Sequence, residues 1–337
     1  MLEDISLTVN SDSGQPVPVR AWRLAGQGDG PRVHLQAGIH ADEIAGMLVL
    51  HKLLPRLEQA HVDGRLRGTV TVVPQANPLG IGQFRNGHIL GRFHEATSRN
   101  FNRHFNESAA LQRPATTFAA WQKALVDLAV DAQIVLDLHT DSEALPYLYV
   151  NRCFWPDARD LAGALDASVA ILWDNDDDGA FEGAMVSHWL REKQIEGRLA
   201  ATVELRGQSD VSDALADRDA QGIYAFLCGR GVIEERGDQR AWSGEAVPMG
   251  HMETVFAPVS GVLVYERELG AQVAEGERIA RIVARPGDPS SEHVLRAPQA
   301  GRLVTRCRDR LIAQGDVVVK LTGSKPSASW TGGVLDP

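Results

Sequence analysis

The chain alternates short apolar runs with segments of helical periodicity, and few folds accommodate this order. Near-continuous apolar runs recur over residues 33–37, 69–73, 134–138 and 199–203. Between them, apolar residues recur at helical spacing over 43–57, and further helices are indicated near 116–129 and 182–193. Strands that are apolar on both faces and are separated by helices are typical of a largely parallel sheet covered by helices. The sequence therefore predicts an α/β domain.

Polar side chains stand at or just beyond the ends of three of these runs: His40, Glu43, His139 and Glu204. Open α/β sheets bind their ligands at the edge where the strands end. We therefore expect these four side chains to lie close together at that edge.

The motif His40-x-x-Glu43 lies where an apolar strand turns into a helix, so both side chains can reach one metal ion. A catalytic zinc takes three protein ligands and leaves its fourth position for water. Two ligands close in sequence and one distant histidine fit this arrangement, so the sequence predicts one zinc ion held by His40, Glu43 and His139. The alternative, an acidic residue favoured at a helix N-terminus, explains Glu43 but neither histidine.

The segment 74–106 is long, polar and without clear periodicity. A loop of this length in a compact domain is usually functional or disordered. It contains Asn77-Pro78, Arg85 and the sequence RNFNRHF at 99–105, which is rich in donors suited to carboxylates and oxyanions. We favour a functional loop over a solvated one.

Together these motifs resemble the succinylglutamate desuccinylase/aspartoacylase family of the zinc-carboxypeptidase superfamily. The similarity covers residues from about 15 to 323 and rests on the order and spacing of His40-x-x-Glu43, the Asn77-Pro78 to Arg85 run, Asn102-Arg103, Asp137-Leu138-His139 and Val203-Glu204. It implies a zinc-carboxypeptidase-like mixed, largely parallel sheet flanked by helices. Carried over by position, the zinc ligands are His40, Glu43 and His139, the general base is Glu204, the oxyanion-stabilising arginine is Arg85, and the carboxylate clamp is Asn102 with Arg103.

The chemistry of these residues agrees with the implied roles. Zinc lowers the pKa of its bound water to around 7, and a carboxylate such as Glu204 can take the proton as the hydroxide attacks an amide carbonyl. A fixed guanidinium, here Arg85, helps to stabilise the charge that develops on the carbonyl oxygen. Asp137 precedes His139 by two residues and can support its imidazole from the same side of the strand, although a salt-bridged structural role explains Asp137 equally well. For Glu204 the alternative is a charged strand end, and for Arg103 it is a structural ion pair.

At two positions, residue roles cannot be transferred directly from the family. Many family members have an acidic residue two positions before the Asn-Arg pair, where this chain has Asn100, so an interaction that orients the arginine is lost or remade. Arg206 follows the expected base by two residues, and strand alternation would place it on the same side, where its charge could select an acidic acyl group. An outward ion pair is the alternative for Arg206.

The C-terminal part of the chain contains an internal repeat. The sequence APVSGVLV at 257–264 returns as APQAGRLV at 297–304, and each copy is followed by a glycine-marked turn and an apolar strand. Short strands with Gly and Pro between them predict a small β-barrel or sandwich of two similar halves. It resembles a lipoyl or biotinyl hammerhead, but Lys320 lies late in the second half and is not the modifiable lysine, so we expect a structural role. In the family, such a domain narrows the zinc cleft and implies small substrates.

Length, charge and composition set further limits. A chain of 337 residues is long enough for two domains. We expect a zinc hydrolase domain at 1–245, the β-domain at 250–323 and a flexible tail at 324–337. The net charge is −10, and the basic residues are not concentrated in the sequence as a basic face would require, which argues against nucleic-acid binding. Without a signal-peptide core or an apolar run of about 20 residues, we expect a cytoplasmic protein that does not bind membranes.

The three cysteines, Cys153, Cys228 and Cys307, are widely spaced, which argues against both a disulfide framework and a structural zinc cluster. The acidic stretch 174–178 is either a solvated turn or a rim that favours a cationic substrate group.

The sequence predicts a zinc-dependent amidohydrolase that acts on a small N-acyl amino acid or related amine. A carboxypeptidase of short peptides would use the same site, because Asn102-Arg103 would bind a terminal carboxylate in either case. A catalytically silent zinc scaffold needs neither a base nor an oxyanion partner, so Glu204 and Arg85 argue against it. The acyl group, the amine, the physiological metal and the oligomeric state, including a homo-oligomer, stay open.

Overall fold

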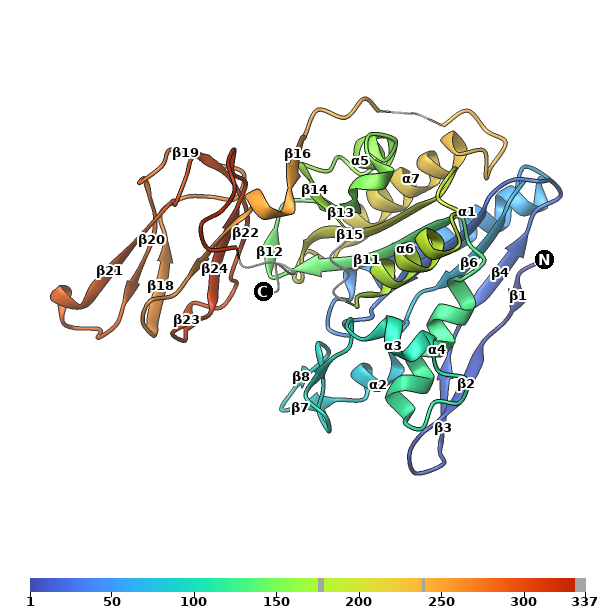
Figure 1. Cartoon of the computed structure of the whole chain (residues 1–337), viewed down its shortest axis with the longest axis horizontal. Coiled ribbons are helices and arrows are strands. Elements are labelled where there is room, and N and C mark those ends of the chain that lie inside the picture. Colours follow the sequence, from blue (N-terminus) through green and yellow to red (C-terminus); the bar gives the residue numbers. More distant parts are fainter. Residues whose placement is uncertain (175–178, 238–239, 331–337) are drawn as a thin grey trace.

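The computed structural model describes residues 1–174, 179–237 and 240–330, and a nine-stranded sheet forms its largest element (Figure 1). Its strands lie in the order β1 (Glu3–Asp4), β4 (Trp22–Ala25), β6 (Thr69–Val73), β5 (Arg32–Ala37), β11 (Ile134–Asp141), β15 (Leu199–Gly207), β13 (Tyr147–Asn151), β14 (Val169–Trp173) and β16 (Glu245–Pro248). Pairing is parallel from β6 to β15 and again from β13 to β16, and antiparallel elsewhere. The predicted mixed, largely parallel sheet is confirmed.

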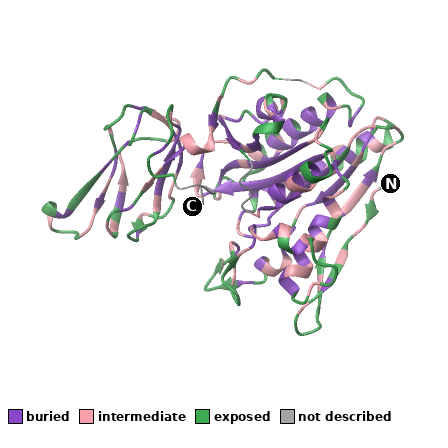
Figure 2. Ribbon diagram, viewed as in Figure 1, coloured by how far each residue is buried: buried purple, intermediate pink, exposed green. Residues whose placement is uncertain are grey.

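Helices cover both faces of this sheet, which explains the apolar composition of its central strands. On one face α6 (Phe181–Arg191) packs its Phe181 ring 5.8 Å from the ring of His34 on β5. On the other face lies α1 (Ala45–Val62), where a Cβ at Gly46 would lie only 2.8 Å from Cβ of Leu138. Every residue of β11 is buried, and Figure 2 shows the central strands as the most buried part of the fold.

A helix that the sequence analysis did not include, α7 (Asp213–Gly229), packs against α1 and against α5 (Arg159–Ala164). Its start carries a recognisable signal, because the Ser212 hydroxyl caps the helix by accepting a hydrogen bond from the Leu215 amide at 3.3 Å. The predicted helix at 116–129 is present as α4 (Thr117–Ala129).

The long segment 74–106 folds into short elements. These are α2 (Pro78–Ile81), the hairpin of β7 (Phe84–Arg85) with β8 (His88–Ile89), the hairpin of β9 (Phe93–His94) with β10 (Arg99–Asn100), and the start of α3 (Phe105–Ala109). Asn77 anchors the segment to the sheet edge, since its Oδ1 accepts from the Gly80 amide at 2.8 Å and its Nδ2 donates to the Ile39 carbonyl at 2.7 Å.

The C-terminal part is all-β, as predicted. One sheet contains β12 (Glu143–Ala144), β22 (Gly301–Arg306), β24 (Val317–Leu321) and β17 (Glu253–Phe256), with β19 (Gln272–Val273) paired to β22. The other contains β21 (Glu292–Arg296), β20 (Arg278–Val283), β18 (Gly261–Tyr265) and β23 (Leu311–Ile312). The two copies of the sequence repeat become β18 and β22, one in each sheet, and apolar side chains between the sheets form a separate core.

The two parts of the chain are joined by more than a linker. Strand β16 begins at residue 245, the expected end of the hydrolase domain, and pairs with β14 of the large sheet. Strand β12 follows β11 directly and pairs with β22 of the β-domain. A small apolar cluster includes Tyr147 and Val169 from the large sheet and Val304 from the β-domain. The described part of the tail also packs, because the Ser327 hydroxyl donates to Glu253 at 2.6 Å, while residues 331–337 lie outside the described part.

Within the described residues, none of the helices has the length and apolar character that crossing a bilayer requires. The three cysteines, all in the described part of the chain, are free.

Candidate active site

A cavity of about 300 Å³ opens at the edge of the sheet where β5, β11 and β15 end. Its walls include all four groups that the sequence placed at strand ends, His40, Glu43, His139 and Glu204. This volume lies at the low end of the range for small-molecule sites, which suits a small substrate.

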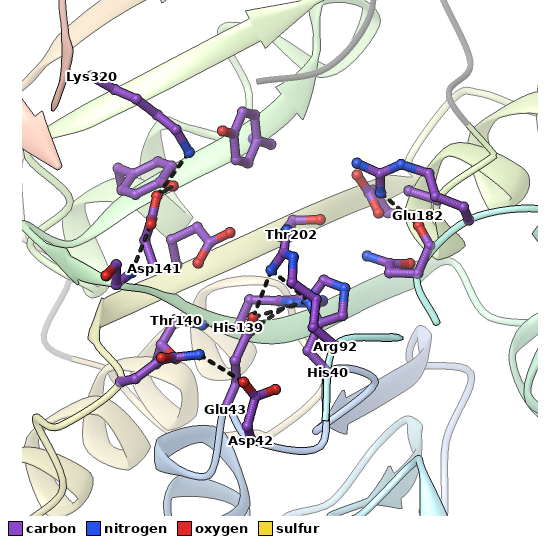
Figure 3. Close-up of a pocket in the computed structure, with 18 of the residues that line it drawn as sticks. His40, Asp42, Glu43, Arg92, His139, Thr140, Asp141, Glu182, Thr202 and Lys320 are labelled. Atoms are coloured by element: carbon purple, nitrogen blue, oxygen red, sulfur yellow. Dashed lines mark hydrogen bonds and ion pairs between the residues drawn. The ribbon is translucent and has the colours of Figure 1, made fainter. Parts of the chain in front are cut away.

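His40, Glu43 and His139 form a compact buried cluster (Figure 3). The turn after β5 carries His40, Glu43 lies two residues before the start of α1, and His139 lies on β11. Nδ1 of His40 is 2.9 Å from Oε1 of Glu43, and Nδ1 of His139 is 2.9 Å from Oε2 of the same carboxylate. The three ligand atoms all lie within 4.8 Å of one another.

The outer nitrogens of both imidazoles are fixed by acceptors. Nε2 of His139 lies 2.8 Å from Oδ2 of Asp137, and Nε2 of His40 lies 2.9 Å from Oδ1 of Asn100. An Nε2–H that donates to these oxygens leaves the Nδ1 lone pair of each ring directed at the centre of the cluster. Two imidazole nitrogens and a carboxylate, each oriented in this way, are a donor set that fits a divalent zinc ion. Asn100 thus supports a histidine of the cluster.

The electrostatics of the cluster favour positive charge beside Glu43. Burial by itself raises the pKa of Glu43, but the imidazoles of His40 and His139 hold it well below its ordinary value. Burial likewise lowers the pKa of His139, yet the carboxylates of Asp137 and Glu43 raise it well above the usual range. For His40, burial and the nearby Arg92 guanidinium lower the pKa. The carboxylate of Glu43 is thus held in its charged form, and the cluster favours positive charge beside it, which a bound metal cation would supply.

Glu204 lies on β15 directly beside His139, its register partner on β11, and is also paired with Tyr147 at the start of β13. Its Oε2 is buried and has no hydrogen-bond partner among the described residues. Burial first, and then the charge of Glu43, raise the pKa of Glu204 to about 8. A carboxylate with a raised pKa in a cleft is suited to accept a proton.

Asn102 and Arg103 also line the cavity. Oδ1 of Asn102 accepts from the Phe181 amide at 2.9 Å, which connects this loop to the first residue of α6. The Arg103 guanidinium donates to the Asn102 carbonyl at 2.6 Å. The structure thus brings the two residues of the expected carboxylate clamp into one cavity with His40, Glu43 and His139.

Arg85 lies elsewhere. Its side chain on β7 is 59% exposed and does not line the cavity, and Nη2 of its guanidinium lies 2.8 Å from Oε2 of Glu95. The reason is the β7–β8 hairpin, which directs Arg85 to the surface, where Glu95 supplies a carboxylate. The arginine that reaches the cluster is Arg92, whose Nη1 lies 3.4 Å from both Nδ1 of His40 and Oε1 of Glu43.

Arg92 is not among the predicted site residues, although the glycine before it offers a signal. Gly91 accepts a hydrogen bond from the Ala41 amide at 2.9 Å, and a Cβ at Gly91 would lie only 2.1 Å from the Asp42 backbone nitrogen. Only glycine permits this approach to the turn between His40 and Glu43. The contact delivers the next side chain, Arg92, to the cluster.

Arg206 also lies outside the cavity, and a bulge explains why. Between Glu204 and Gly207 the register shifts, so that three steps along β15 match two steps, from His139 to Asp141, along β11. The extra residue turns Arg206 away from the Glu204 side of the sheet. Its guanidinium instead forms a buried ion pair with Asp219 of α7, with Nη1 3.2 Å from Oδ1.

Further cavity residues come from regions to which the sequence analysis assigned no site role. Tyr147 and Tyr149 on β13, Asp141 at the end of β11, and Lys320 and Arg308 from the β-domain all line the cavity. In the acidic stretch, Asp174 forms an ion pair with Arg152 at 2.8 Å, and residues 175–178 lie outside the described part.

Known proteins share both the sequence pattern and the fold of this chain. Residues 29–230, more than half of the chain, match the model of the succinylglutamate desuccinylase/aspartoacylase catalytic domain. The chain belongs to this family.

Two relatives show how far the family likeness extends. The N-alpha-acetyl-L-2,4-diaminobutyric acid deacetylase of Halomonas elongata is 25% identical over 308 residues, which cover 87% of this chain and 82% of the relative. The crystal structure of a succinylglutamate desuccinylase/aspartoacylase family protein from Shewanella amazonensis matches with a TM-score of 0.82 at 25% identity, covering 95% of this chain and 98% of the other. The product-bound ectoine utilization protein EutE (DoeB) of Ruegeria pomeroyi shares the fold, with a TM-score of 0.73 at 22% identity and coverage of 95% and 94%.

Proposed function

We propose that this family member is a zinc-dependent amidohydrolase that removes the acyl group from a small N-acyl amino acid or related N-acyl amine. One observation supports this most strongly. The carboxylate of Glu204 lies beside the buried cluster of His40, Glu43 and His139 in one cavity, and its Oε2 has no partner among the described residues. A structural metal site needs no such carboxylate, whereas hydrolysis needs a group that accepts a proton from water.

Each residue of the cavity has a task in this proposal. His40, Glu43 and His139 hold the zinc ion, which when bound supplies an activated water and polarises the acyl carbonyl. Glu204 accepts a proton from the attacking water and returns it to the departing amine. Arg92 takes the role expected for Arg85, because its guanidinium lies beside the cluster, where negative charge develops on the carbonyl oxygen.

The substrate is small and carries a carboxylate. A cavity of about 300 Å³ matches the lower end of small-molecule sites, and Asn102 with Arg103 offers an amide and a guanidinium to a carboxylate. The Halomonas relative is named for the deacetylation of N-alpha-acetyl-L-2,4-diaminobutyric acid, so N-acetyl derivatives of short diamino acids are the first substrates to test.

The test is amine release by the zinc-loaded chain from N-acetyl, N-succinyl and N-formyl amino acids, N-acetyl diamino acids and short peptides. The control is Glu204→Gln, which keeps the size of the side chain but removes its ability to accept a proton. We expect turnover of one N-acyl class that is lost in the variant. Cleavage of peptides alone would favour a carboxypeptidase, and zinc binding without any turnover would favour the scaffold.

A further inference from the structure

The β-domain places a lysine inside the catalytic cavity. Lys320 lies on β24, and its side chain is only 2% exposed. Figure 3 shows it directed toward Asp141. Its Nζ donates to Oδ2 of Asp141 at 3.0 Å, across 179 residues of sequence. Both residues line the cavity that holds the His-Glu-His cluster. A lysine is rarely buried to this degree unless it is paired, and here Asp141 supplies the paired carboxylate. The open question is what the buried pair does.

Asp141 occupies a position that the sheet alone does not fix. It ends β11 two residues after His139, at the point where the register between β11 and β15 shifts. Side-chain bonds supplement the interrupted ladder there. Oδ2 of Asp141 accepts from the Tyr147 hydroxyl at 2.9 Å as well as from Lys320, and Oδ1 accepts from the Ser142 amide at 2.6 Å. These bonds are made at the point where the chain leaves β11 of the large sheet and continues into β12, which pairs with the β-domain.

A simple role in holding the two domains together does not require a buried charge. Glu143, two residues further on, already makes ion pairs with Arg306 and Arg310 of the β-domain, with Nη2 of Arg310 at 2.7 Å. Those two arginines lie outside the cavity lining. A buried ion pair adds little net stability, because the cost of removing both charges from water offsets their attraction. The position of the Lys320 pair, inside the cavity, therefore indicates a role in the site.

We propose that Lys320 is a positioning residue for the catalytic centre: through Asp141 it holds the end of β11 and thereby the placement of His139. The β-domain thus completes the active site in addition to narrowing it. The turnover part of the test below rests on the proposed function, whereas the metal part does not.

The experiment compares Lys320→Met with Lys320→Arg, Asp141→Asn and the double variant, all in the full chain. Arg306→Met is the matched control, because it removes a cross-domain ion pair of the adjacent segment outside the cavity. We expect Lys320→Met to lower kcat by about 10²-fold with a smaller change in KM, since a small misplacement of a reacting group costs about that much. Lys320→Arg should restore much of the rate, and the double variant should be no slower than either single variant, because both act through one contact.

The metal readout does not depend on any substrate. We expect Lys320→Met to bind zinc about 10–100-fold more weakly in chelator competition and to change the visible spectrum of the cobalt-loaded protein, while Arg306→Met matches the parent chain. Thermal melting confirms that each variant is folded, and the double variant removes the unpaired buried charge that could unfold Lys320→Met.

Two results with the variants would overturn the proposal. One is a cobalt spectrum and zinc affinity of Lys320→Met equal to those of the parent, and the other is an equal change in Lys320→Met and Arg306→Met. If the parent chain hydrolyses no N-acyl amine, the proposed function fails, and the metal readout still decides the role of Lys320. A parent chain that binds neither metal overturns both.

Discussion

The two sides of the cavity are built differently. On one side, His139 and Glu204 lie on β11 and β15, adjacent strands within the sheet, and both residues are paired in register. On the other side, Arg92 belongs to a segment of two-residue strands and reaches the cluster only at 3.4 Å, with 24% of its side chain exposed. The strand side can hold groups whose geometry must be fixed before substrate arrives. The hairpin side holds Arg92 beside the cluster through side-chain contacts at 3.4 Å, a distance that can shorten when a substrate binds.

The largest effect is expected on the strand side. Glu204→Gln should lower kcat by about 10²–10⁴-fold, because it removes the proton acceptor while leaving the His-Glu-His cluster unchanged. The measurement is the steady-state rate with the best N-acyl substrate, together with the zinc content of the purified variant. A loss of zinc along with the rate would mean that Glu204 serves the metal site and is not a base.

The hairpin side should show a contrast between its two arginines. Arg92→Met should lower kcat by about 10²–10³-fold, as removal of an oxyanion donor does elsewhere. Arg85→Met breaks an exposed ion pair with Glu95 and should leave both kcat and the melting temperature close to the parent values. Equal losses in the two variants would contradict the placement of Arg92 as the functional arginine.

A smaller effect, on zinc affinity, is expected from the residues that hold the two imidazoles in place. Asp137 supports His139 from the strand side, and Asn100 supports His40 from the hairpin side. Both Asp137→Asn and Asn100→Leu should weaken zinc binding, by about 10–100-fold. We expect the larger loss for Asp137→Asn, because a charged acceptor is replaced by a neutral one. Chelator competition measures both, and an unchanged affinity in both variants would remove the proposed supporting role.

The same contrast between strands and hairpins explains which features of the site could be predicted from the sequence. Apolar runs and strand alternation are local properties, so they indicate the sheet and bring His139 beside Glu204. Arg85 and Arg92 both lie in a segment without periodicity. The close approach of Gly91 to Asp42 brings Arg92 to the cluster, whereas Glu95 pairs with Arg85 at the surface. Lys320 reaches the cavity because the β-domain packs beside the large sheet. The residue spacing within β24 does not indicate this packing.

The bulge in β15 leads to the last and smallest expected effect on catalysis. Strand alternation would have placed Arg206 beside Glu204 as a selector of acidic acyl groups, whereas the structure pairs it with Asp219. Arg206→Ala should therefore leave the ratio of kcat/KM for N-succinyl and N-acetyl substrates unchanged. It should instead lower the free energy of unfolding by about 3–5 kcal/mol, because it leaves the carboxylate of Asp219 buried and unpaired.

A double variant tests whether the instability of Arg206→Ala comes from the unpaired carboxylate of Asp219 or from loss of the ion pair itself. Arg206→Met with Asp219→Asn removes both charges and should recover much of the stability, since no buried ion then lacks a partner. Denaturant unfolding measures the stability of the three proteins, and competition between the two acyl substrates measures their preference. A changed preference in Arg206→Ala at unchanged stability would mean that the guanidinium reaches the substrate after all. In that case the end of β15 would have to move when substrate binds, and the strand side of the cavity would be less rigid than its register implies.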